Sequence, residues 1–348
     1  YCNYLDYYVL GKHYQNSGGG KLKFKYQEQD FYFDWGGNYR HETFEYRELT
    51  NEDDSIPKVF QDNYALFANT KLSQDIFPYS LSLFLSGRWD FTSEFKDFGS
   101  WKISPECSYE NVFKFIVGGS AGNGFTIPSF YNLYWKGDSQ AMGNPYLIPE
   151  ESLSWQVFSK VELYDNFIKF SYRHDDIDNM IIWFQNFNYT WKPTNLSAAE
   201  VSNYEIEAEI NLFQFLKLAG TYIKIGAFDR TRNEDGSQTS FYGKKIIYTP
   251  DFAMNLNFNL TYKNLNCRIS YAKTSEQWST RDQLTEEKQL PAYDLVDGNV
   301  FYSKQLRKFE IKTGIRANNI FDKLYEIYEY IPQPGFNWEV SIKIEYKI

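Results

Sequence analysis

Hydrophobic and polar residues alternate with a period of two along much of the chain. In residues 79–91 the odd positions are mainly leucine and aromatic residues, and the even positions are mainly serine and charged residues. In residues 252–262 a row of Phe, Met, Leu and Tyr interleaves with Asn, Ala and Thr. The same pattern recurs in residues 265–271, 309–315 and 338–346. Because successive side chains of a strand point to opposite faces, the pattern predicts β-strands with one apolar and one polar face.

The length of these alternating runs distinguishes between two kinds of β-protein. A soluble β-sandwich also alternates, but its strands average about five or six residues. The runs here extend over roughly nine to thirteen residues, which is enough for a tilted strand to cross a bilayer. Several runs begin and end in aromatic residues, as strands of outer-membrane barrels do at the two membrane interfaces. The pattern therefore favours a membrane β-barrel over a soluble sandwich.

Short and long connections also alternate along the chain. Tight turns are expected near Asp165-Asn166, Phe213-Gln214, Lys263-Asn264 and Leu306-Arg307. Longer polar stretches lie between them and include residues 227–245 and 273–290. Outer-membrane barrels have short periplasmic turns and longer extracellular loops. We therefore predict an all-β fold, a transmembrane antiparallel β-barrel with about 16 strands in this chain and the long stretches outside the cell.

The composition agrees with strands rather than helices in the membrane. Aromatic residues make up 20% of the 348 residues, and aromatic belts at two membrane interfaces would explain this excess. Mean hydropathy is -0.56, and no stretch approaches the ~18 consecutive apolar residues of a spanning helix, which excludes a helical membrane protein. The net charge of -9 argues against a nucleic-acid partner, whose phosphates require a basic surface.

Residue types that usually carry catalysis or bind metals are few in this sequence. The cysteines are Cys2, Cys107 and Cys267. Their odd number and their spacing predict free thiols, with neither a disulfide framework nor a zinc site. The histidines are His13, His41 and His174. None lies in a recognisable nucleophile motif, so we expect no enzyme. His174 adjoins Asp175, Asp176 and Asp178, but a solvated loop is the preferred interpretation, and we assign no metal site and no cofactor.

Two segments carry more information than periodicity. Residues 124–135 read GFTIPSFYNLYW, and residues 143–152 read GNPYLIPEES. In order and spacing they resemble a signature of TonB-dependent receptors. The runs at 191–195, 319–325 and 332–335 resemble the closing strands of the same family, so the resemblance extends over about two-thirds of the chain. The chain departs from the family at three positions, with Asn203 for Gly, Phe336 for Arg and Ile348 for a terminal Phe.

The resemblance implies an outer-membrane receptor that imports a ligand with energy supplied through TonB. Barrels of that family have about 22 strands around a plugged lumen. The plug domain and the TonB box have no counterpart in this sequence, which has neither an initiator Met nor a signal peptide. We therefore expect residues 1–348 to be the C-terminal part of the barrel, with the plug and the first strands before Tyr1. Implied partners are outer-membrane lipid and lipopolysaccharide, the TonB complex through the missing N-terminal part, and a small-molecule ligand.

The identity of the ligand rests on a narrower resemblance. The run from Pro128 to Trp135, followed by GNPYL, is most similar to the vitamin B12 receptor branch. Cobalamin or a related corrinoid is therefore placed ahead of a ferric siderophore. No His stands between Phe125 and Leu147, where haem receptors of the family carry one, which disfavours haem. A passive porin is a further alternative, because alternating strands indicate a barrel and say nothing about gating.

Five aromatic residues are the candidate ligand contacts. Tyr131, Tyr134 and Trp135 precede the loop at 136–144, where interfacial anchoring is the preferred alternative to ligand stacking. Tyr242 and Trp278 fall in the long polar stretches, where an aromatic side chain has less reason to lie without a ligand or lipopolysaccharide. The Gly and Pro residues of the two signature segments are expected to set the course of the backbone.

Overall fold

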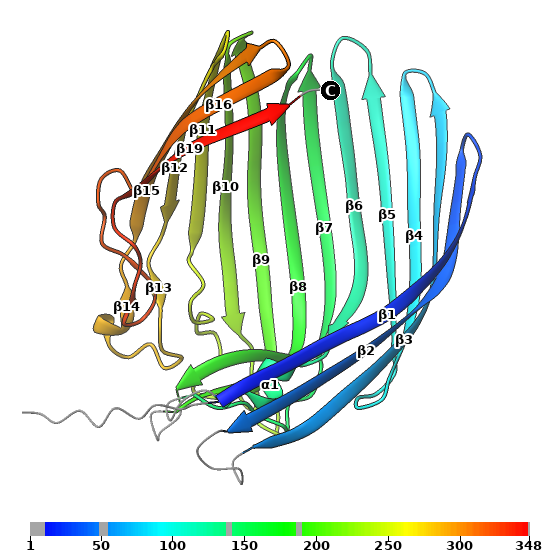
Figure 1. Cartoon of the computed structure of the whole chain (residues 1–348). Coiled ribbons are helices and arrows are strands. Elements are labelled where there is room, and N and C mark those ends of the chain that lie inside the picture. The colour runs from blue at the N-terminus through cyan, green and yellow to red at the C-terminus, as the bar shows by residue number, and fades with distance from the viewer. Residues whose placement is uncertain (1–10, 49–54, 137–140, 186–189, 347–348) are drawn as a thin grey trace, which may run out of the picture.

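The computed structural model describes residues 11–48, 55–136, 141–185 and 190–346, and most of them form one curved antiparallel sheet (Figure 1). Each strand pairs with its neighbours in chain order, and β1 and β19 form the two edges of the described sheet. The strands are β1 (Gly11–Gln27), β2 (Phe31–Glu48), β3 (Ile56–Ile76), β4 (Tyr79–Thr92), β5 (Phe98–Glu110), β6 (Lys114–Thr126), β7 (Glu150–Leu163), β8 (Asn166–Gln185), β9 (Trp191–Phe213), β10 (Leu216–Asp229), β11 (Phe252–Tyr262), β12 (Leu265–Thr274), β15 (Tyr293–Leu306), β16 (Phe309–Asn318) and β19 (Asn337–Tyr346).

These 15 strands confirm the predicted all-β antiparallel fold, with one strand fewer than the approximate count from the sequence. The alternative of a soluble sandwich is wrong, because the described sheet is a single curved layer (Figure 1). In the part of the chain that the structure describes, no helix is both long and apolar enough to cross a bilayer.

The connections separate by length between the two ends of the sheet. Turns at one end, uppermost in Figure 1, occupy residues 77–78, 111–113, 164–165, 214–215, 263–264 and 307–308. The four turns predicted from the sequence are therefore correct to within one residue. The opposite end carries the long connections at 127–149, 230–251, 275–292 and 319–336. Their short elements are α1 (Phe130–Tyr134), β13 (Gln277–Trp278), η2 (Glu286–Lys288), β14 (Gln289–Leu290), β17 (Glu326–Tyr328) and β18 (Ile331–Pro332).

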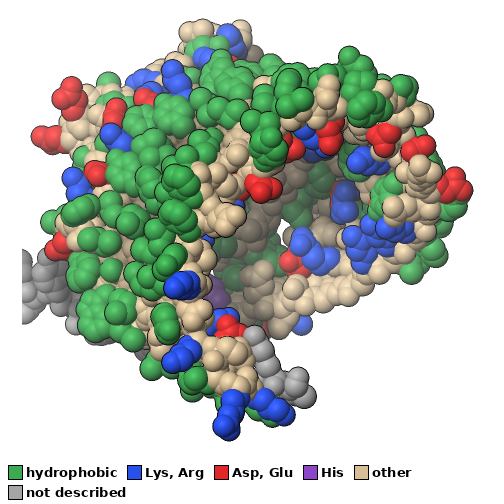
Figure 2. Space-filling model, turned by 90° about the horizontal axis from the view of Figure 1, so that it is seen from above, with side chains coloured by type: hydrophobic (Ala, Val, Ile, Leu, Met, Phe, Trp, Pro, Cys, Tyr) green, Lys and Arg blue, Asp and Glu red, His purple; other side chains and the backbone are tan. Residues whose placement is uncertain are grey.

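The two faces of the sheet differ as the period-two pattern predicts. In β4 the side chains of Leu81 and Trp89 are exposed on the outer face, whereas Asp90 on the opposite face is only 7% exposed. Hydrophobic side chains cover much of the outer wall, and many charged side chains line the hollow that the sheet encloses (Figure 2). A continuous apolar surface of this size is typical of a wall that faces lipid.

Aromatic contacts mark both borders of this apolar band. Near the short turns, ring centroids lie 5.4 Å apart for Tyr79 and Tyr109. Toward the long connections, Tyr172 lies 5.2 Å from Trp155 and 4.6 Å from Tyr204. Such girdles anchor outer-membrane barrels at the two interfaces. The strands continue beyond the second girdle to the long connections, and in outer-membrane barrels the longer connections lie at the extracellular end.

Candidate functional site

The first signature segment forms a short helix that is tied to a neighbouring strand. Ser129 caps α1, because its hydroxyl accepts a hydrogen bond of 3.1 Å from the backbone N–H of Asn132. The side-chain oxygen of Asn132 in turn accepts a 3.0 Å hydrogen bond from Trp183 Nε1 on β8. The segment is thus fixed against the wall at its extracellular end.

Asparagines join the second signature segment to the run at 191–195. Asn144 Nδ2 donates to the carbonyl of Pro193 at 3.0 Å. The Asn195 side chain donates to the carbonyl oxygens of Ile148, at 3.0 Å, and Asn179, at 2.7 Å, and it accepts from the Ile148 N–H at 3.0 Å. These hydrogen bonds therefore join the second signature segment to the first residues of β9, which lie far from it in sequence.

Some of the prolines and glycines of this region are closely packed by the surrounding chain. Pro128 and Pro193 are fully buried. A Cβ at Gly143 would lie 2.6 Å from the carbonyl oxygen of Leu133, which is too close for any side chain.

Of the three aromatic residues predicted around α1, two are held in tight packing. The Trp135 ring stacks on His13 of β1 at 5.0 Å with an interplanar angle of 6°. The Tyr134 ring lies 5.9 Å from Phe44 of β2. Tyr131 is half exposed, and its ring lies 5.4 Å from Trp183. Tyr131 is therefore the member of this group that is most accessible to a ligand.

Tyr242 and Trp278, the two aromatic residues predicted in the later connections, form contacts within and between these connections. The Tyr242 ring lies 4.8 Å from the guanidinium of Arg232, which also donates to the Tyr242 hydroxyl at 3.2 Å. Trp278 belongs to β13, and its carbonyl accepts a 2.7 Å hydrogen bond from the N–H of Tyr248. The structure does not bring these two side chains together with Tyr131.

An aromatic cleft of about 650 Å³ lies where the long connections meet, and we refer to it as the loop cleft. It is lined by Tyr131, Ala141, Met180, Ile182, Trp183, Trp191, Ile246, Ile247, Tyr248, Thr249, Tyr328, Glu329 and Ile331. Of the aromatic residues in this lining, Tyr131 is one of the ligand contacts predicted from the sequence, and the others are not. One feature of the sequence could have indicated them. Several lie in or beside the long connections, where an aromatic residue is not needed to anchor the barrel at a membrane interface.

Three of the connections interlock around the loop cleft. Arg281 pairs with Asp229 at 2.7 Å, and the Asp229 side chain is 1% exposed. Gln283 Nε2 donates to the Lys245 carbonyl at 2.6 Å. The segment 275–292 is thereby joined to the last residue of β10 and to the connection 230–251.

The same segment is also joined to the connection at 319–336. Gln277 Nε2 donates to the Ile327 carbonyl at 3.2 Å, and Lys288 pairs with Glu329. These ion pairs and hydrogen bonds link the three connections around the loop cleft, and we refer to the linked segments 230–251, 275–292 and 319–336 as the cross-braced connections.

Burial and this ion pair set the protonation states at the loop cleft. Burial, with a smaller contribution from the charge of Glu329, raises the pKa of Tyr248 to about 12. Burial also raises the pKa of Glu329, but hydrogen bonds, of which that from Lys288 is the strongest, outweigh it and bring this pKa below its usual value. The hydrogen bond to Glu329 raises the pKa of Lys288. At neutral pH Tyr248 is therefore a neutral hydroxyl, and Lys288 and Glu329 are a charged pair.

The acidic group at His174 lies in a strand, so its assignment to a loop was wrong. Residues 174–178 belong to β8, where consecutive side chains point to opposite faces. Asp175 is buried against Arg173, with a 2.7 Å contact, whereas His174 approaches Asp176 at 3.3 Å on the other face. Within the described ranges, no three His, Cys, Asp or Glu side chains converge in a way that could hold a metal ion.

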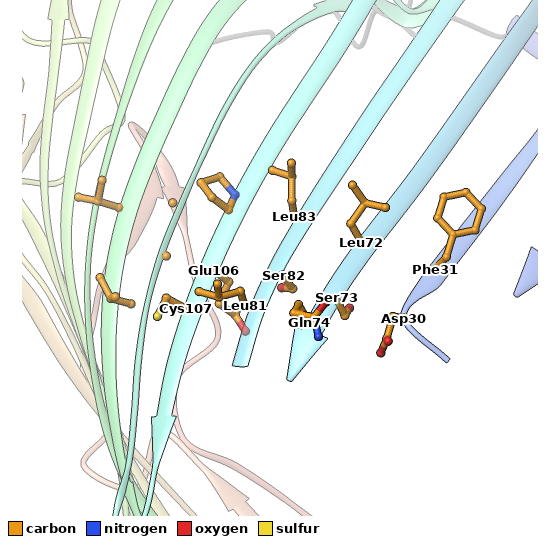
Figure 3. A pocket seen from close by; sticks show the side chains of 15 residues that line it. Asp30, Phe31, Leu72, Ser73, Gln74, Leu81, Ser82, Leu83, Glu106 and Cys107 are labelled. Carbon is orange, nitrogen blue, oxygen red and sulfur yellow. The ribbon is translucent and has the colours of Figure 1, made fainter. Parts of the chain in front are cut away.

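A larger depression of about 860 Å³ lies on the wall over β2–β7 (Figure 3). Its apolar lining includes Leu72, Leu81 and Val117, which are exposed on the outer face. It therefore belongs to the surface that faces lipid and lies away from the loop cleft. Cys107 lines it as a free thiol, Cys267 is also free, and Cys2 lies outside the described residues.

The sequence matches a known family of outer-membrane proteins. The family model described as TonB dependent receptor-like, beta-barrel matches residues 3–320. The chain belongs to this family, and it is an outer-membrane β-barrel protein.

Two vitamin B12 transporters are similar in sequence to this chain. The chain is 26% identical over 295 residues to the vitamin B12 transporter BtuB of Vibrio vulnificus, a match that covers 83% of this chain and 43% of that protein. It is 29% identical over 264 residues to the protein of that name from Photobacterium profundum, with 71% and 39% covered. The chain thus spans less than half the length of these relatives.

Solved structures show the same fold. The copper transporter OprC superposes with a TM-score of 0.69 at 12% identity, over 97% of this chain and 57% of that one. A mutant of the ferric enterobactin receptor PfeA from Pseudomonas aeruginosa superposes with a TM-score of 0.67 at 15% identity, over 95% of this chain and 54% of that one.

Proposed function

We propose that this chain is part of a receptor that imports a scarce, large ligand across the outer membrane with energy delivered through TonB. The observation that carries the proposal is membership of the TonB-dependent receptor family over nearly the whole chain. The cross-braced extracellular connections support it, because a binding site for a dilute ligand benefits from walls that are ordered before the ligand arrives.

The proposed ligand is cobalamin or a related corrinoid, ahead of a ferric siderophore. The vitamin B12 transporters among the relatives support this order. The copper and siderophore proteins among the solved structures share only 12–15% of their residues with this chain, so their likeness concerns the fold alone. The loop cleft adds support, because its lining is mainly apolar and aromatic.

A direct binding titration on the full-length receptor tests the ligand. Cyanocobalamin and a panel of ferric siderophores are titrated at matched concentrations, with quenching of intrinsic Trp fluorescence or calorimetry as the readout. The proposal predicts saturable binding of cyanocobalamin below micromolar concentration. Tight binding of a ferric chelate without measurable binding of cyanocobalamin would discard the corrinoid and leave the transport proposal standing.

The proposed domain arrangement has a separate test. A plug domain and the first strands of the barrel are expected upstream of residue 1. Sequencing the gene upstream of the codon for residue 1 shows whether they are present. An upstream sequence without a plug would favour a passive pore.

A further inference from the structure

Tyr248 lines the loop cleft, and its hydroxyl has no hydrogen-bonding partner in the part of the chain that the structure describes. The Tyr248 hydroxyl is buried, and no residue of the described chain forms a hydrogen bond with it. The backbone N–H of Glu329 lies near enough to lower the pKa of this group slightly, but it is outside hydrogen-bonding geometry. A buried hydroxyl without a partner is costly to the fold. A ligand that accepts its proton would remove that cost.

Aromatic rings contact the ring of Tyr248 and line the loop cleft beside it. The Tyr328 ring meets the Tyr248 ring edge to face at 5.1 Å and 63°. The Trp191 ring lies 6.3 Å from that of Tyr248. Tyr131 and Trp183 form another pair that lines the same cleft. Walls of this kind favour a flat ring system, because aromatic faces and edges attract each other beyond simple burial.

The charge of the lining argues against an anionic occupant. Among the described residues that line the loop cleft, Glu329 is the one charged side chain, and it forms an ion pair with Lys288. No Lys or Arg belongs to the described lining. An anionic catecholate or carboxylate would lose its hydration there, and the nearby Lys288 is already paired with Glu329, which makes binding of an anion unfavourable. Burial holds the Tyr248 hydroxyl in its protonated form by raising its pKa, so the hydroxyl acts as a donor.

We propose that the loop cleft binds an uncharged, planar aromatic or heteroaromatic part of the ligand, and that the Tyr248 hydroxyl donates a hydrogen bond to an acceptor on it. This inference deepens the proposed function, on which it rests for the presence of an extracellular ligand. A benzimidazole-like base or a carboxamide beside a flat ring has the required chemistry. A ferric tris-catecholate, which carries several negative charges, does not.

The test uses the full-length receptor and three probes, namely cyanocobalamin, 5,6-dimethylbenzimidazole and a ferric tris-catecholate. Tyr248→Phe removes the donor and keeps the ring, whereas Trp191→Leu removes a ring and keeps an apolar side chain. Tyr146→Phe is the matched control, because Tyr146 lies in the connection at 127–149, is 86% exposed and does not line the cleft. Thermal unfolding of each variant is the second readout.

The inference predicts that Tyr248→Phe weakens binding of cyanocobalamin or of 5,6-dimethylbenzimidazole about fivefold, the effect of one neutral hydrogen bond. Trp191→Leu should weaken it about two- to tenfold, and Tyr146→Phe should leave it unchanged. The thermal stability of Tyr248→Phe should not fall, because the substitution removes a buried group that has no partner. A merely structural hydroxyl would give the opposite result.

Three outcomes would overturn the inference. Binding of cyanocobalamin that is equal in wild type and both cleft variants would refute the cleft and leave the proposed function intact. Loss of ferric tris-catecholate binding in the cleft variants would refute the ligand class. Absence of binding by both uncharged probes would refute it as well. Binding of 5,6-dimethylbenzimidazole that depends on Tyr248, without binding of cyanocobalamin, would support the cleft while removing the corrinoid proposal.

Discussion

Replacing a single side chain on the outer wall of β11 tests which face of the sheet meets lipid. Phe258 is 44% exposed and pairs across the sheet with Leu218 and Ile269, both apolar. The adjacent Asn257 points to the opposite face, where its side-chain oxygen accepts a 2.8 Å hydrogen bond from the Ser270 hydroxyl. Phe258→Asp and Asn257→Asp therefore introduce the same charge on opposite faces of one strand.

The expected difference follows from the depth of the site. A charged residue on the lipid face at the bilayer midplane costs about 2–4 kcal/mol for Lys or Arg and less for Asp. A cost of about 2 kcal/mol would reduce the ratio of folded to unfolded protein roughly 30-fold. Asn257→Asp should change that ratio little, because the inner face is polar and keeps its contact with water or polar groups.

Two measurements on the full-length receptor compare these variants. The first is the fraction that is assembled in the outer membrane, read from the altered gel migration of unheated barrels. The second is the urea midpoint of unfolding in lipid vesicles. Phe258→Asp should lower both values, and Asn257→Asp should leave them near wild type. Equal losses in the two variants would refute the assigned facing.

Two further predictions concern the cross-braced connections. Arg281→Gln leaves Asp229 buried without an ion-pair partner, which costs about 3–5 kcal/mol locally. Limited proteolysis within 275–292 should therefore become faster. Unchanged proteolysis would contradict the role of this ion pair in holding the connections together. The pKa of Glu329 lies below its usual 4.5, so its pairing with Lys288 stabilises 319–336 at higher pH and is lost as pH falls below about 4.5. Hydrogen exchange in 319–336 should therefore be constant between about pH 8 and 6 after correction for intrinsic rates and faster below about pH 4, and a transition near neutral pH would contradict this assignment.

Much of the wall could be predicted from the sequence because its determinants are local. The alternation in 79–91 and 252–262 specifies which face of β4 and β11 meets lipid, since a side-chain period of two leaves no other arrangement. The turns between neighbouring strands follow directly from where the alternation is interrupted. Antiparallel neighbours in chain order require no long-range information.

The loop cleft could not be predicted in the same way. Trp191, Tyr248 and Tyr328 lie in three different regions of the sequence, and only the packing of the connections brings them together. The polar group at His174 was assigned to a loop because both faces of β8 are polar at this point. Beyond the girdle a strand is wetted on both sides, so the alternation that identifies a membrane strand disappears.

Energy coupling is the central claim, and uptake in cells that lack TonB tests it most directly. Labelled cyanocobalamin is presented to cells that express the full-length receptor, with and without TonB, and surface-bound and internalised label are measured separately. The account predicts that binding at the surface persists without TonB and that internalisation stops. Internalisation at the same rate in both strains would contradict the account and identify a passive pore.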